Sequence, residues 1–168
     1  MSVTDLRGRE DVKKTKLADR IETRGERCKL FWEHLIARHP IEWSYAKPTK
    51  LAYRWREIPE LRLVITQYVS FSTSSVGVFI RGERGTALSI VRGRLKPFVK
   101  ELKKALRSEL DFFGKRKNFD TDDVAKWDAM ADWLHRQADA YEDALRRTMR
   151  RRFTNVPKVA VARREVRE

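Results

Sequence analysis

The chain has 168 residues, of which 41% are hydrophobic, and 38 Lys and Arg against 24 Asp and Glu give a formal net charge of +14. A chain of this length forms a hydrophobic core without disulfides or metals, and its single cysteine, Cys28, excludes an intrachain disulfide and fits a reducing compartment. No apolar run approaches the ~18 residues of a membrane span, and residues 1–16 lack a secretory signal pattern. We therefore expect a cytoplasmic protein with no membrane partner.

The charge excess predicts a polyanionic partner, because a strongly basic surface repels itself unless a counter-charge is bound. Nucleic acid comes first, since each neutralised phosphate releases condensed counterions. An acidic protein surface is the second candidate. An anionic membrane surface, which such a charge could also bind, is not the partner expected here. A basic profile that serves only solubility is the alternative without a partner.

Residues 1–22 alternate charges with few large apolar groups and predict a basic arm. A single domain is expected over residues 23–153, followed by a basic tail over residues 154–168. Thr23 and Glu26 form a capping box that starts a helix, and Pro40 ends it. The apolar residues of this helix recur at steps of three and four, as expected for one buried face: Cys28, Phe31, Trp32, Leu35 and Ile36.

Three strand-like runs follow. In residues 50–56, Tyr53 and Trp55 alternate with basic residues, which predicts a half-buried strand whose rings face the core and whose cations face solvent. Residues 61–71 and 76–80 are rich in β-branched side chains. Short connections between consecutive strands favour an antiparallel meander.

Two helical segments close the domain. Residues 86–110 carry a narrow apolar stripe interrupted by Pro97, which predicts a kink or a break. A helix from Asp120 or Thr121 keeps its apolar phase for about seven turns. Between them, residues 110–118 predict either a short fourth strand or a packed loop. The expected fold class is α+β: one helix, an antiparallel meander of three or four strands, and two long amphipathic helices packed on one sheet face.

The most informative functional pattern lies within residues 86–110. Five cations recur at steps of 4, 4, 3 and 4 residues: Arg92, Lys96, Lys100, Lys103 and Arg107. On one straight helix they would share roughly an 80° sector at ~100° per residue, next to the apolar stripe. A row of cations matches the repeating charge of a phosphate backbone. The alternative is an ordinary solvated helix face.

Two further sets of cations are candidate nucleic-acid contacts. The first is Lys50, Arg54 and Arg56, with the nearby aromatic residues Trp43 and Tyr45, since rings interleaved with cations bind single strands. The second comprises Arg146, Arg147, Arg150 and Arg151 at the end of the last helix, which suits non-specific binding or is a solvated helix end. Trp133 lies off the apolar stripe of that helix and predicts either an interface or a second contact within the domain.

No catalytic site, metal site or cofactor site is predicted. His34, His39 and His135 lack partners at ligand spacing, and no glycine loop suits a phosphate. A metal-dependent nuclease would have to gather carboxylates from separated strands, such as Glu57 and Glu83. We keep this as the third functional hypothesis.

Three stretches resemble an uncharacterised bacterial and archaeal family over about residues 24–152. They are Lys29-Leu30-Phe31-Trp32-Glu33, Val76-Gly77-Val78-Phe79-Ile80-Arg81-Gly82, and the segment from Trp127 to Asp132-Trp133-Leu134. The family is a domain of unknown function often found C-terminal to predicted restriction-type nucleases. The resemblance implies a defence, restriction or mobile-element setting, and it supplies no catalytic residues.

Together these patterns predict a non-catalytic nucleic-acid-binding or accessory module. The alternative is a protein-interaction module, such as an inhibitor or adaptor of a nucleic-acid machine, that binds an acidic protein surface.

Overall fold

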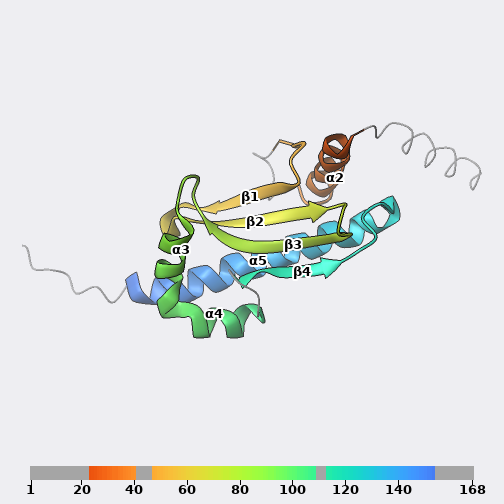
Figure 1. Ribbon diagram of the computed structural model, residues 1–168. Helices are drawn as coiled ribbons and strands as arrows, with labels where there is room; N and C mark the ends of the chain where they lie inside the picture. Colours follow the sequence, from red (N-terminus) through yellow and green to blue (C-terminus); the bar gives the residue numbers. More distant parts are fainter. Residues whose placement is uncertain (1–22, 41–46, 109–112, 154–168) are drawn as a thin grey trace, which may run out of the picture.

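The computed structural model describes residues 23–40, 47–108 and 113–153, with side chains described as far as Met149 (Figure 1). The predicted arm and tail, and the aromatic residues Trp43 and Tyr45, lie outside the described residues. Among the helices of the described part, none has the length and apolar character of a membrane span.

A four-stranded antiparallel sheet forms one layer of the molecule. Its strands follow chain order, β1-β2-β3-β4. Their bounds are Tyr53–Ile58 for β1, Leu63–Ser70 for β2, Ser75–Gly82 for β3 and Lys115–Asn118 for β4. The antiparallel meander is confirmed, and the uncertain segment before the last helix supplies the fourth strand.

Helices form the second layer. The longest, α5 (Trp127–Phe153), lies behind the sheet in Figure 1 and contacts β2 and β3. It also contacts both α2 (Arg24–Arg38) and α4 (Val99–Leu106). The α+β class is therefore confirmed, with α5 as the central helix.

The first helix begins where its capping box predicts. The Thr23 hydroxyl accepts a hydrogen bond from the Glu26 amide at 3.3 Å, which satisfies one of the free N–H groups of the first turn. Phe31, Trp32 and Leu35 are completely buried. They join a core with fully buried side chains of the strands and of α5, among them Ile58, Leu63, Ile65, Ile80, Met130, Leu134, Tyr141 and Leu145.

The break predicted at Pro97 is confirmed. Helix α3 (Leu88–Leu95) is followed by a 3₁₀ turn, Lys96–Phe98, and then by α4, which runs in a different direction (Figure 1). Proline lacks an N–H donor, and its ring collides with the carbonyl of the preceding turn. The segment is thus two short helices around a bend instead of one straight rod.

The predicted orientation of β1 is wrong. Arg54 pairs across the ladder with Gln67, and Arg56 pairs with Ile65, so these residues share one sheet face. Gln67 donates to the Leu134 carbonyl of α5 at 3.0 Å, which identifies that face as the one α5 covers. Tyr53 and Trp55 therefore lie on the opposite face, because successive side chains of a strand alternate.

Candidate nucleic-acid interface

Acids of α5 and of the segment just before it are paired with cations of α2. Arg38 donates to Asp132 at 2.5 and 2.8 Å, and Arg27 pairs with Asp122. The hydrogen bond from Arg38 lowers the pKa of Asp132 to about 2. Asp122, Asp128 and Asp132 are thus paired within the domain, where α2 lies beside α5 and the segment before it.

Cations predominate on the segment that runs through α3 and α4. Residues 88–107, which we call the α3–α4 limb, hold seven Lys and Arg against one acid, Glu101. The five cations of the predicted row are all exposed. No ion pair joins Lys96, Lys100, Lys103 or Arg107 to an acid within the described residues.

The bend at Pro97 changes the geometry predicted for this row. Arg92 lies on α3, Lys96 in the 3₁₀ turn, and Lys100 and Lys103 on α4. Arg107 caps α4 in a left-handed conformation with φ of 49°. A single 80° sector is therefore wrong, and the five cations follow a curved limb.

The three cations predicted around β1 do not form a basic face. Arg54 is 7% exposed, and its guanidinium lies 5.8 Å from the centre of the Trp32 ring. Burial lowers the pKa of Arg54 to about 10. Arg56 donates to Asp139 of α5 at 2.6 Å, and the exposed Lys50 pairs with Glu26. The prediction that Arg54 and Arg56 contact phosphates from a solvent face is wrong, because both side chains point toward the helical layer.

At the end of α5, one of the two described arginines of the predicted cluster is paired with acids and the other is exposed. Arg146 pairs with Glu142 at 2.8 Å and with Glu60 of the turn after β1, whereas Arg147 is exposed. The side chains of Arg150 and Arg151 lie outside the described part. Trp133 is 8% exposed and belongs to the core, because α5 is covered by several elements at once. Its ring makes a contact within the domain and offers no interface.

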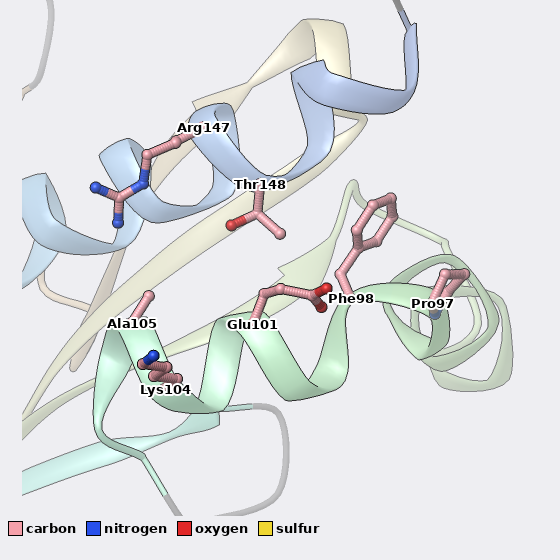
Figure 2. A pocket seen from close by; sticks show the side chains of 7 residues that line it. All are labelled: Pro97, Phe98, Glu101, Lys104, Ala105, Arg147 and Thr148. Carbon is pink, nitrogen blue, oxygen red and sulfur yellow. The ribbon is translucent and has the colours of Figure 1, made fainter. Parts of the chain in front are cut away.

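A hollow of about 600 Å³ separates α4 from the end of α5 (Figure 2). Phe98 and Glu101 line it from the α4 side, and Arg147 and Thr148 from α5, while Lys104 lies at the rim. The hollow links the α3–α4 limb to Arg147. Its acid at the centre gives it mixed charge.

The sheet face opposite α5 was not predicted as a site, yet it carries four rings that are exposed or half-buried. In Figure 1 no described helix covers this face, which we call the open sheet face. Its side chains follow from the register, since paired residues share a face. They include Tyr53 and Trp55 of β1, Tyr68 of β2, Phe79 and Arg81 of β3, and Arg116 of β4.

The rings on this face are ordered against one another. Tyr53 and Trp55 stack with centroids 5.8 Å apart and planes 17° apart. The guanidinium of Arg81 lies 4.4 Å from the centroid of Trp55. Tyr68 and Phe79 are 6.3 Å apart. Tyr53 is 40% exposed, and the other rings are half-buried.

A cavity of about 420 Å³ lies on the open sheet face. Tyr53, Tyr68 and Phe79 line it together with Arg81 and Arg116, and this volume falls in the ~300–1,000 Å³ range of small-molecule sites. Thr66 also lines it, is 2% exposed, and its hydroxyl has no hydrogen-bond partner within the described structure. The indole N–H of Trp55 is likewise buried and unbonded there.

The alternation of side chains along β3 could have predicted part of this face from the sequence. In β3, Val76, Val78 and Ile80 are fully buried, so Phe79 and Arg81 must point the other way. In β1 the same rule leaves two solutions, and apolar character alone favours the wrong one, in which the rings face the core.

The two acids considered for a nuclease, Glu57 and Glu83, lie on different segments and have different surroundings. Glu57 lies on β1, on the open sheet face, and Glu83 follows β3 and pairs with Arg62 at 3.3 Å. In the described ranges, no three His, Cys, Asp or Glu side chains form a group suited to a metal ion.

Comparison of the chain with models of protein families, with curated proteins and with solved structures found no match. What the molecule binds is therefore inferred from its own surfaces.

Proposed function

We propose that this protein is a non-catalytic nucleic-acid-binding or accessory module. The observation that supports this function is the charge imbalance of the α3–α4 limb: acids of α5 are paired with cations of α2 and β1, whereas the limb holds seven Lys and Arg, six of them exposed, against one acid. The family resemblance adds a defence, restriction or mobile-element setting to the proposal.

The physical basis is contact between lysines and a phosphate backbone. Lys96, Lys100 and Lys103 are exposed along the bend, so each ammonium group is available to a separate phosphate. Each neutralised phosphate releases counterions, and affinity for duplex DNA falls with salt by a slope of about 0.9 per contact. Such contacts place a protein on the polymer without reading its sequence.

The test is fluorescence anisotropy with labelled duplex DNA, single-stranded DNA and RNA at two salt concentrations, in the presence of magnesium. We expect salt-sensitive binding that the triple variant Lys96→Glu, Lys100→Glu, Lys103→Glu loses while it stays folded. The control instead reverses three cations on α2, on the 3₁₀ turn before α5 and on α5: Lys29→Glu, Lys126→Glu and Arg136→Glu. Equal loss in both variants would reduce the effect to net charge, and unchanged affinity in the first would remove the α3–α4 limb from the interface.

A protein-interaction module is the second candidate. Leu88 and Ile90 on α3 are each 49% exposed, next to the cations of the limb, and apolar side chains rimmed by polar groups mark protein contacts. A module of this kind would show almost no salt-dependent affinity for pure nucleic acid. Magnesium-dependent cleavage that Glu57→Gln or Glu83→Gln abolishes would instead establish the nuclease.

A further inference from the structure

We infer that the open sheet face binds unpaired bases, so that the substrate class is single-stranded nucleic acid. This inference rests on the proposed function and names the polymer that the module takes. It comes from a surface distinct from the α3–α4 limb, on the face of the sheet that α5 leaves open (Figure 1).

The first support is the arrangement of the rings. Tyr53 and Trp55 lie nearly parallel, and Arg81 covers Trp55 at 4.4 Å, so planar groups already stack on this face. Tyr53 keeps 40% of its surface exposed, and with Tyr68 and Phe79 it lines the cavity. A nucleobase is a planar π system of the same kind, and ring stacking accepts every base.

The second support is the charge around the rings. Arg24, Arg81 and Arg116 also line the cavity. Guanidinium groups at the edge of a stacking surface meet the phosphates between the bases, or stack on a base themselves. An apolar peptide would cover these charges without pairing them, which is costly.

The third support is the unmet hydrogen bonding under the rings. The Thr66 hydroxyl, in a residue 2% exposed that lines the cavity, has no partner in the described structure, and neither has the Trp55 indole N–H. Buried polar groups of native proteins nearly always have partners. Both atoms are shielded from solvent, so the edge of a base could bond to them only when the surrounding side chains shift, and a purely apolar ligand could not bond to them at all.

These contacts require bases that are free. In a duplex the ring faces are stacked on neighbouring base pairs, so Tyr53 could reach a base only after it is unstacked. A single strand presents its bases at no such cost. Charge on the α3–α4 limb attracts either polymer, and only the open sheet face distinguishes them.

The experiment compares two strands of about 12 nucleotides, a length within known single-strand site sizes. One is an oligothymidine, and the other has the same phosphates with abasic sugars. We expect the wild type to bind the first more tightly. Tyr53→Ala should weaken oligothymidine binding about 5- to 150-fold, as does removal of one stacked ring elsewhere, and should leave abasic binding unchanged. Tyr53→Phe keeps the ring and should bind like the wild type. Val124→Ala, which trims an exposed apolar residue far along the chain, is the matched control.

The outcomes separate this inference from the proposed function. Equal affinity for the two strands, with no effect of Tyr53→Ala, would overturn the inference. The proposed function would still stand if the Lys96, Lys100, Lys103 variant lost binding. Tighter binding of duplex than of single strands would also overturn the inference and leave the proposed function standing. Poly-glutamate that binds as well as oligothymidine would point to a protein partner and overturn both, as would the absence of binding to every polymer. Ultraviolet cross-links from thymine to Tyr53, Tyr68 or Phe79 would place the bases on this face.

Discussion

The ring of Tyr68 lies directly over Gly77 on the neighbouring strand. The two residues are cross-strand partners, and a Cβ added to Gly77 would fall closer to Cε1, Cζ and Oη of Tyr68 than real Cβ atoms come to other atoms. Glycine at this position therefore leaves room for the Tyr68 ring to lie against the sheet. Burial there raises the pKa of the Tyr68 phenol.

Gly77→Ala should displace the Tyr68 ring and destabilise the domain. Forcing an extra carbon into a packed site costs about 1–3 kcal/mol, and a lower midpoint of urea unfolding measures it. The same variant should weaken binding of oligothymidine, because Tyr68 lines the cavity on the open sheet face.

Gly93→Ala is the matched control for this substitution. Gly93 lies within α3, and nothing lies within 4 Å of its added Cβ. Alanine is the better helix former, so we expect a gain of about 0.5–1 kcal/mol. A loss of stability in Gly93→Ala equal to that in Gly77→Ala would contradict the packing explanation.

Arg56→Gln should lower the free energy of unfolding by about 1.5–3 kcal/mol, the usual range for hydrogen bonds to charged groups. Arg56 is 15% exposed and donates to Asp139 and Glu142 of α5 at 2.6 and 3.2 Å. The comparison is Arg62→Gln, since Arg62 is 67% exposed in its pair with Glu83 and should change stability by no more than ~0.5 kcal/mol. Equal effects in chemical unfolding would show that Arg56 does not face α5.

Stability should fall on mild acidification because of His39. Its ring stacks on His135 at 4.0 Å. Burial, together with the neighbouring His135 and Arg38, lowers the pKa of His39 below its ordinary 6.5, and this outweighs the hydrogen bond to Asp132. The unfolded chain therefore binds a proton more readily than the folded one, so stability rises with pH across this window.

The test is the urea midpoint between about pH 7.5 and 5.5, which spans the window below 6.5. The full contribution is present above 6.5 and is lost as pH falls through the lowered pKa of the folded state. His39→Gln should flatten this part of the profile. A slope that persists in the variant would assign the effect to another group.

Asp132 should cause a second decrease in stability at more acidic pH. Its pKa in the folded protein is about 2 against an ordinary 3.8, chiefly because Arg38 donates to it. The stabilisation is complete above 3.8 and disappears as pH falls toward 2. Asp132→Asn should remove this acid step in a pH titration of the unfolding midpoint, and a variant that kept the step would show that the Arg38 contact does not cause it.

Cys28 should react slowly with a thiol reagent in the native protein. The residue is 1% exposed in the core, and burial raises the pKa of its thiol against the effect of Arg24 and Arg27. Only the thiolate attacks, and only after α2 opens. We expect labelling in the native state to be at least about a hundredfold slower than in urea. Rapid native labelling would place Cys28 outside the core.

The elements that could be predicted are those whose signals are local. Thr23 and Glu26 lie within one turn, and Pro97 breaks the helix by its own covalent structure. The facing of β1 depends on distant partners, because Asp139 and Glu142 lie 83 and 86 residues beyond Arg56. Alternation shows which residues share a face, but not which face is buried.

The candidate site divides in the same way. Lys96, Lys100 and Lys103 were predictable as exposed cations, because no local acid could pair with them on a helical face. The curve of the α3–α4 limb could not be predicted, because the helix break at Pro97 does not define the direction in which the next helix runs. Tyr68 and Phe79 come together only through the pairing of β2 with β3.

The strand order leaves β4 at one edge of the sheet, and this edge reads Lys115-Arg116-Lys117-Asn118. An unpaired edge is a template on which another chain can add a strand, and lysine is a common means of preventing it. A second copy docking there in antiparallel fashion would set cations opposite cations, which is unfavourable. Strand-by-strand polymerisation through β4 is thereby disfavoured.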